Sequence, residues 1–200
     1  YFALRTYPVT VTQSPNGTIA PGGTNWVGHG NNLNLTITPA TNYVVQNLVV
    51  DATSYGPQGL FLLTNVTAPH VVTAAFALVN FPLTIQSLRP VTAPPVGTTF
   101  RPWNAPITAS VTGSPVFFGS TQYVCTGWTR TGSAPGAGPQ TNVFFNIITN
   151  TVHRWNWATQ YLLNVTAGPN GTISGPPNGF YPAGAGGIAI TATPSNGYYF

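Results

Sequence analysis

Charge is what this sequence most conspicuously lacks. Only 3% of its 200 residues are charged: there are five arginines, one aspartate (Asp51), and no lysine or glutamate. An ordinary soluble domain carries about 25% charged residues. Disorder is excluded as the cause, because disordered chains are rich in charge and poor in aromatics, whereas this chain is 42% hydrophobic and 12% aromatic. The chain therefore buries a core and solvates its surface mainly with Thr, Asn, Ser and Gln.

The scarcity of other residue types excludes several kinds of function. General acid–base catalysis needs a tuned pair of groups, and Asp51 has no acidic partner, so we predict that the chain is not an enzyme. A lone cysteine, Cys125, excludes an intrachain disulfide and a multi-cysteine metal site. His29, His70 and His153 stand in three separate segments without metal-ligand spacing. We therefore predict no metal and no cofactor.

Two classes of partner are excluded in the same way. The five arginines give a net charge of +4, but they are scattered and form no cluster of the kind that phosphate backbones require. No apolar run approaches the roughly 18 residues of a membrane-spanning helix. We predict that the chain binds no nucleic acid and has no membrane-spanning segment.

Two expectations concern the few reactive groups. Cys125 stands in an apolar and aromatic strand, residues 123–128, in which period two places Tyr123 and Cys125 on the core face. We expect the thiol to be buried and slow to react, as free cysteines in cores are. Because so few groups titrate between about pH 3 and 9, we also expect stability to depend little on pH in that range.

Internal repeats organise the chain. The sequence Tyr-Pro-Val-Thr-Val-Thr-Gln-Ser-Pro-Asn-Gly-Thr-Ile at 7–19 returns at 161–173 as Tyr-Leu-Leu-Asn-Val-Thr-Ala-Gly-Pro-Asn-Gly-Thr-Ile. A second similarity relates residues 2–11 to residues 76–85. We expect the chain to be a window from a longer array, with the following organisation: residues 1–6 as the closing strand of a preceding unit, 7–80 as the first unit, 81–160 as a variant second unit, and 161–200 as the first half of a third.

The hydrophobic pattern within a unit predicts β-strands. Val9 and Val11 alternate with Thr10 and Thr12, which is typical of a half-buried strand. Pro-Asn-Gly at 15–17 and at 169–171 predicts hairpin turns with two positive-φ positions. The fold class predicted is all-β, a tandem array of small sandwich or curled-sheet units without substantial helix. Seven short strands are expected in the first unit, at about 7–13, 17–20, 24–27, 33–38, 43–51, 60–64 and 70–78.

Three motifs carry a resemblance to a known family. They are Tyr-x-x-x-Val-Thr-x-x-Pro-Asn-Gly-Thr-Ile from residue 7, Leu-Thr-Ile-Thr-Pro-x-x-x-Tyr at 35–43, and Leu-Thr-Asn-Val-Thr-x-x-His-x-Val-x-Ala-x-Phe at 63–76. The sequence resembles bacterial-repeat domains, the divergent relatives of the internalin B repeats of long secreted and surface proteins. Residues 81–160 are similar to a variant found beside such repeats. The resemblance implies an extracellular or cell-surface location, and it implies no catalytic residues.

Candidate binding residues are of two kinds. Trp155 and Trp157 are two apart on one strand and are expected in the core. Trp103 and Trp26 are candidates for glycan stacking or inter-unit contact. Of these, Trp103 is expected to be the most exposed. Five asparagines fit the N-glycosylation pattern and are expected in turns, in a loop and at outward strand positions: Asn16, Asn34, Asn65, Asn164 and Asn170.

Serial β units with almost no linker, joined at Tyr-Pro or Phe-Pro, are expected to form a semi-rigid rod, because proline stiffens each joint. The function predicted is a structural unit of an extracellular filament, stalk or surface array. The alternative is an adhesin or carbohydrate-binding module of a cell-surface protein. The partners expected are other copies of the chain or neighbouring repeat units, and surface glycans.

Overall fold

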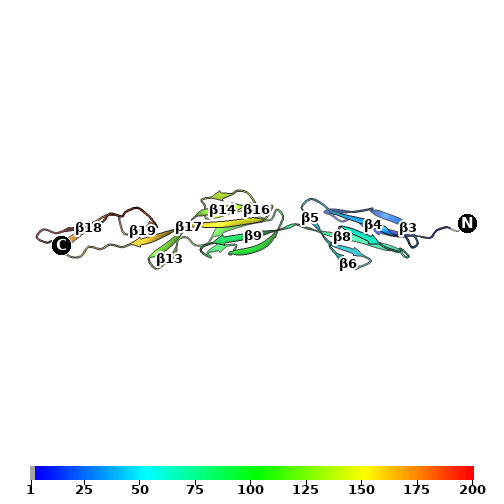
Figure 1. Cartoon of the computed structure of the whole chain (residues 1–200), viewed down its shortest axis with the longest axis horizontal. Helices are drawn as coiled ribbons and strands as arrows, with labels where there is room; N and C mark the ends of the chain where they lie inside the picture. The colour runs from blue at the N-terminus through cyan, green and yellow to red at the C-terminus, as the bar shows by residue number, and fades with distance from the viewer. Residues whose placement is uncertain (1–2) are drawn as a thin grey trace. The chain divides into compact units, whose positions relative to one another are not determined.

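The computed structural model describes residues 3–200 and divides into two compact units, an N-terminal unit that ends at Asn80 and a C-terminal unit, residues 81–200 (Figure 1). Every regular element of the described residues is a β-strand, so the all-β prediction is confirmed. Helices of the length and apolarity that would cross a membrane are accordingly not found among residues 3–200.

The N-terminal unit is a sandwich of two sheets. The larger has the strand order β3-β1-β8-β5-β6 and the smaller the order β2-β4-β7. The larger sheet is built from β1 (Thr6–Val11), β3 (Gly23–Gly28), β5 (Tyr43–Val50), β6 (Thr53–Gly56) and β8 (His70–Leu78). The smaller is built from β2 (Gly17–Ala20), β4 (Leu33–Pro39) and β7 (Leu60–Leu63).

The core of this unit lies between the two sheets, as the alternation of the sequence predicts. Val9 and Val11 of β1 are buried while Thr10 between them is exposed. Ile19 of β2 and Leu35 of β4 contribute to the same hydrophobic cluster from the smaller sheet. Burying a side chain of this size contributes about 1.5–3 kcal/mol, so the facing apolar rows hold the two sheets together.

Two details of the first unit differ from the prediction. Pro15 and Asn16 do not close a hairpin, because β1 and β2 belong to different sheets. Of the turn residues only Asn16 has a positive φ, 72°, which fits a type II turn because proline fixes a negative φ before it. The strand Thr53–Gly56 was not expected; it forms because Asp51 and Ala52, both at positive φ, make a tight turn after β5.

The first part of the C-terminal unit, residues 81–160, is also a sandwich of two sheets and is called here the middle sandwich. Its larger sheet runs β11-β9-β17-β14-β13, with β15 also paired to β14, and its smaller sheet runs β10-β12-β16. The larger sheet comprises β9 (Asn80–Ser87), β11 (Gly97–Pro102), β13 (Val116–Phe118), β14 (Thr121–Thr131), β15 (Ala137–Gly138) and β17 (Thr151–Leu163). The smaller comprises β10 (Thr92–Ala93), β12 (Pro106–Val111) and β16 (Asn142–Asn146).

A β-bulge occupies the equivalent place in both sandwiches. The register of β5 against β8 shifts between Val45 and Asn47, and the register of β14 against β17 shifts between Cys125 and Gly127. An extra residue in one strand reverses which side chains face the core beyond it. In the middle sandwich this turns Trp128 and Arg130 inward, to the same side as Cys125.

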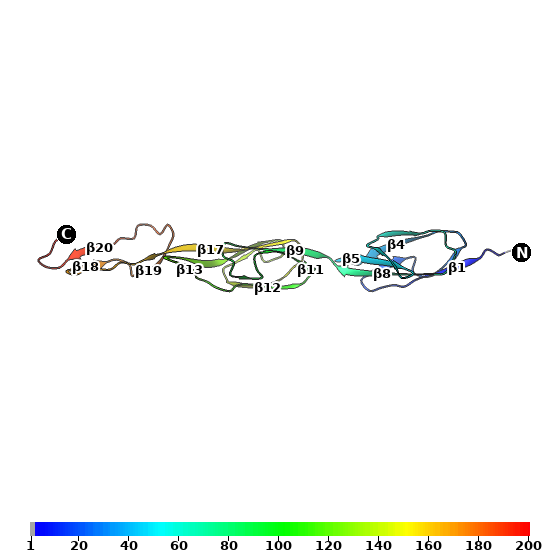
Figure 2. The ribbon, with the colours of Figure 1, turned by 90° about the horizontal axis from the view of Figure 1, so that it is seen from below.

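The remaining part, residues 161–200, is called here the open segment. It contains β18 (Gly171–Ser174), β19 (Gly179–Pro182) and β20 (Thr191–Pro194), and β19 lies beside the end of β17 (Figure 2). Tyr161 pairs with Tyr181 as Tyr7 pairs with Val27, in the register that the repeat predicts. The open segment thus reproduces the β1–β3 and β2–β4 pairings of the N-terminal unit.

Two of the unit boundaries proposed from the sequence fall at or inside strands. The strand β17 runs without interruption through the proposed boundary between residues 160 and 161. The proposed closing strand at 1–6 falls partly on residues 1–2, which lie outside the described residues, and its last residue, Thr6, is the first residue of β1.

Candidate functional site

The first and last strands of the N-terminal unit are neighbours and run parallel. β1 pairs with β8 from Val9 opposite His70 to Val11 opposite Val72, and the Thr12 N–H donates to the Val72 carbonyl oxygen at 2.9 Å. Because the two strands point the same way, the chain enters at the start of β1 and leaves at the opposite end of the pair, at the end of β8.

The middle sandwich repeats this arrangement with a longer pair. β9 and β17 are parallel from Leu83 opposite Thr151 to Ser87 opposite Trp155. Five residue pairs are in register here, against three in the first unit. At the far end of this pair the Trp157 indole N–H donates to the Ser87 hydroxyl at 2.9 Å, which fixes the end of β9 against β17.

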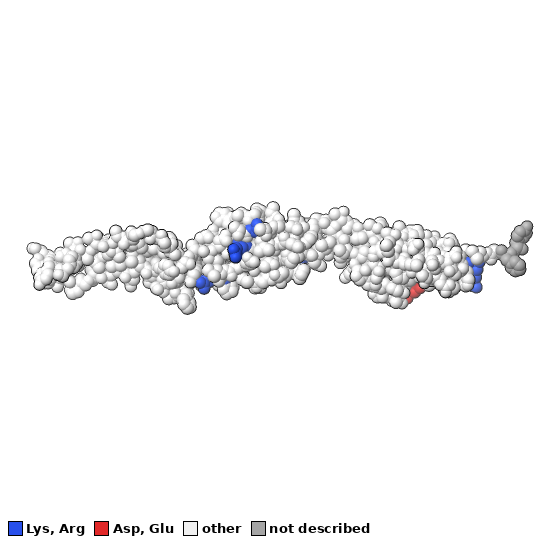
Figure 3. All heavy atoms as spheres, viewed as in Figure 1, with Lys and Arg blue, Asp and Glu red and all other residues white. Residues whose placement is uncertain are grey.

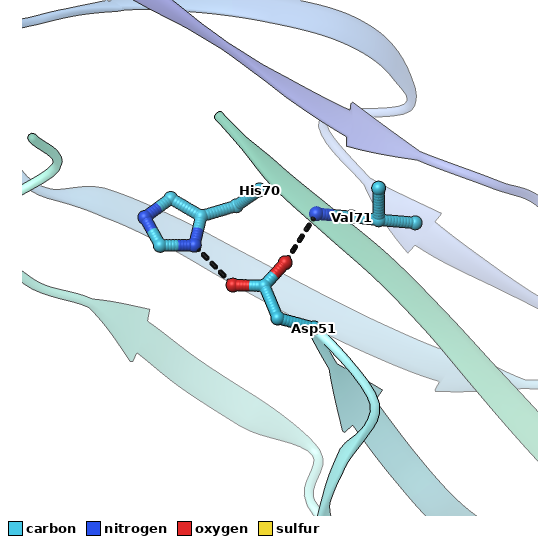
Figure 4. Close-up of polar contacts among 3 residues, drawn as sticks. All are labelled: Asp51, His70 and Val71. Carbon is cyan, nitrogen blue, oxygen red and sulfur yellow. Dashed lines mark hydrogen bonds and ion pairs between the residues drawn. The ribbon is translucent and has the colours of Figure 1, made fainter. Parts of the chain in front are cut away.

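The acidic residue Asp51 ties the turn after β5 to β8. One carboxylate oxygen accepts a hydrogen bond from the Val71 N–H at 2.7 Å, and the other contacts His70 Nδ1 (Figure 4). Burial alone would raise the pKa of Asp51, but the hydrogen bonds from Val71 and His70 outweigh it and hold the pKa below its ordinary value. This pair holds the turn after β5 against the start of β8; sequence reasoning missed it, since 19 residues separate the partners.

Arg130 and His153 form a second polar pair, inside the core of the middle sandwich. Arg130 Nε donates to His153 Nδ1 at 3.4 Å, and Arg130 Nη1 donates to the Ala134 carbonyl oxygen at 3.2 Å. Burial lowers the pKa of Arg130 to about 10, so the guanidinium stays charged at neutral pH. Sequence reasoning missed this pair because it did not include the bulge that turns Arg130 inward.

The predicted glycan-bearing asparagines are all exposed. Asn16 and Asn170 lie in the two equivalent turns at positive φ, and Asn65 also has a positive φ in a loop. Asn34 points outward from β4, whereas Asn164 follows the end of β17 and accepts a hydrogen bond from Asn178 at 3.0 Å. Their accessibility permits glycosylation; whether they are glycosylated stays a prediction.

The tryptophans divide into a buried and an exposed group. Trp128 and Trp155 are buried in the middle sandwich, with Trp157 packed against the same cluster, as expected for Trp155 and Trp157. Trp26 is 68% exposed on β3. The expectation that Trp103 is the most exposed was wrong, because Trp103 is half-buried beside the turn that precedes β12.

Cys125 and the candidate metal ligands show no reactive arrangement among the described residues. Cys125 is buried, as predicted, and burial raises the pKa of its thiol, whose Sγ lies 3.6 Å from the Gly127 carbonyl oxygen. Its slow reaction with thiol reagents stays a prediction. Within residues 3–200, no group of three or more His, Cys, Asp or Glu side chains is placed to hold a metal ion.

Comparison with known families agrees with the repeat pattern. The model of the divergent InlB B-repeat domain matches residues 7–80 and 161–200, which is more than half of the chain. The chain therefore belongs to the divergent InlB B-repeat family, a family associated with bacterial surface proteins. The middle sandwich lies outside the match, although its first and last strands pair in parallel as those of the N-terminal unit do. Comparison with curated proteins and with solved structures gave no match.

Proposed function

We propose that this chain is a structural segment of an extracellular surface array, whose β units resist tension applied along the chain. The observation that carries the proposal is the parallel pairing of first and last strands, β1 with β8 and β9 with β17. Tension pulls the start of the first strand and the end of the last strand in opposite directions. The two strands must then slide past each other, so the hydrogen bonds between them are loaded together rather than one after another.

The passage from the middle sandwich into the open segment also supports a mechanical role. β17 is one continuous strand across it, and the Leu162 N–H donates to the Ser120 carbonyl oxygen at 2.8 Å. Phe117 of β13 meets Phe180 of β19 edge-to-face, with ring centroids 5.7 Å apart. These contacts join the hairpin of β13 and β14 to the next repeat, so that the joint is braced by more than its covalent bonds.

A surface with so little charge suits an extracellular setting. The one acidic side chain lies on the N-terminal unit, and four of the five arginines belong to the C-terminal unit (Figure 3). Repulsion between like charges contributes little to keeping such molecules apart. Glycans on the exposed asparagines would keep the molecules soluble in place of charge. We therefore include glycosylation at these positions in the proposal.

A second candidate function is carbohydrate binding by a surface adhesin. It is favoured by Trp26, whose ring is 68% exposed on β3. An exposed indole offers a flat apolar face with an N–H at its edge, which suits stacking on a sugar ring. The same exposure also suits contact with another copy of the chain.

Immunoelectron microscopy on intact cells of the source organism tests the proposed location and form. Antibodies raised against this chain should label extended material outside the cell without permeabilisation. Antibodies against a cytoplasmic protein of the same cells are the control and should label only permeabilised cells. Labelling by the chain-specific antibodies that appears only after permeabilisation would contradict the proposal.

A further inference from the structure

His153 is enclosed by aromatic rings in the core of the middle sandwich. Its side chain is fully buried. Its ring centroid lies 5.3 Å from that of Trp128, 6.2 Å from that of Phe145, and 4.7 Å from that of Trp155. A residue of this kind has no water to solvate a charge, so its protonation state matters for the packing around it.

The neighbour of His153 fixes it as the neutral imidazole. Arg130, only 6% exposed, points Nε at His153 Nδ1, and a guanidinium can only donate. Nδ1 must therefore carry a lone pair. The guanidinium carbon lies 3.5 Å from the Phe145 ring centroid and 4.6 Å from that of Trp128, so Arg130 is held between two aromatic faces.

No carboxylate can compensate a second positive charge at this place. Residues 81–200 contain four arginines and no aspartate or glutamate. The strands packed around His153 supply no negative charge. From β14 come Arg130 and, in the same core cluster, the neutral Cys125. From β9 comes Ile85, which pairs in register with His153, and from β16 comes Phe145. On its own strand, Arg154 is exposed on the opposite face. Every charged group near His153 is thus positive.

We propose that the middle sandwich is an acid-sensitive element: protonation of His153 replaces its hydrogen bond with Arg130 by repulsion between two buried cations and opens this core, while the N-terminal unit stays folded. This inference goes beyond the proposed mechanical function. It would let an acidic environment release one kind of unit in an array and leave the other intact.

The direction of the pH dependence follows from where the proton is bound. Burial, and then the charge of Arg130, lower the pKa of His153 to about 4, below its ordinary 6.5. Above pH 6.5 His153 is neutral in both the folded and the unfolded state, so its protonation does not change the free energy of unfolding. As the pH falls from 6.5 to 4 the unfolded chain takes up the proton first, so unfolding becomes more favourable, by on the order of 100-fold in total. For this unit the proposal therefore departs from the expectation that stability depends little on pH, and the measurements below decide between the two.

The N-terminal unit has no comparable element. His29 is exposed, and His70 lies against the Asp51 carboxylate rather than against a second cation. The pKa of Asp51 is itself lowered below 3.8, so the stability that this carboxylate contributes is lost only as the pH falls through that lower value. Between pH 6.5 and 4 this unit should keep its stability.

Hydrogen exchange of the whole chain at a series of pH values tests the proposal. Protection, corrected for the intrinsic exchange rate at each pH, should fall on the order of 100-fold in β14 and β17 between pH 7 and 4. Protection in β1 and β8 should change little. Equal behaviour of the two units over this range would overturn the proposal.

Substitution of the histidine separates its titration from the packing. His153→Asn keeps an acceptor near the position of Nδ1, but the asparagine side chain does not titrate. The variant should therefore show no acid-dependent loss of protection, even if it is less stable than the wild type at every pH. His29→Asn, the same change at the exposed histidine, should leave the loss unchanged. Should His153→Asn fail to fold, NMR titration of the wild-type imidazole decides: a histidine that titrates near 6.5 without loss of structure contradicts the proposal.

Discussion

Gly127→Ala is expected to destabilise the middle sandwich strongly and to leave the stability of the N-terminal unit unchanged. Gly127 has φ = 115°, which side-chain-bearing residues rarely adopt, and a β carbon there would lie 2.2 Å from the Gly138 carbonyl oxygen. The obstacle is backbone of the paired strand β15, so no side-chain rotation relieves it. Strain and clash together should cost about 3–5 kcal/mol, a large part of the stability of a small domain.

Urea unfolding of the whole chain, followed by hydrogen exchange in β14 and β8, measures this effect unit by unit. Gly113→Ala is the matched control, because its φ lies outside the left-handed region and its β carbon would meet only Val91, at 3.9 Å. The control should change stability by no more than about 0.5 kcal/mol. A Gly127→Ala variant as stable as this control would show that the bulge is not needed for the fold.

Hydrogen exchange should be far faster in the open segment than in the equivalent strands of the N-terminal unit. Ile173 is 37% exposed where its equivalent Ile19 is 2% exposed, and Ile190 is 44% exposed where Leu35 is 1% exposed. In the described structure of residues 161–200 no residue is buried. Backbone hydrogen bonds that are not covered by a packed core open readily, so we expect exchange about 100-fold faster in β18 and β20 than in β2 and β4.

The comparison must be made on a demonstrated monomer, because association through the apolar side chains of the open segment would also protect it. The repeat supplies its own control, since β18 and β2 share the sequence Gly-Thr-Ile and differ in what covers it. Equal protection in the two strands of a monomer would contradict the assignment of an open third repeat.

The sequence predicts most of this fold because alternation is a local property. Val9 and Val11 face the core as their period of two requires, and Cys125 is buried for the same reason. Where the chain departs from the period, prediction fails: the bulge at Gly127 turns Trp128 and Arg130 inward. A glycine inside a strand pattern is the signal for such a bulge, and it was available in the sequence.

Other features depend on contacts that no local pattern reveals. The turn at Pro15 and Asn16 has hairpin residues, yet it passes the chain from one sheet to the other, because β1 pairs with β3 and β8 instead. The parallel pairing of β1 with β8 joins residues some sixty positions apart, Val9 with His70. The feature on which the proposed function depends most is therefore the one that sequence patterns could not supply.

Single-molecule force spectroscopy on the N-terminal unit within the whole chain tests the mechanical proposal most directly. Handles attached at Arg5 and Val79 load β1 and β8 in shear. Handles attached at Arg5 and His29, whose backbones are hydrogen-bonded at 2.8 Å, peel β1 from β3 one bond at a time. We expect the first geometry to require a severalfold higher unfolding force than the second. Unfolding at the same force in both geometries would contradict the claim that this fold resists tension through its parallel terminal strands.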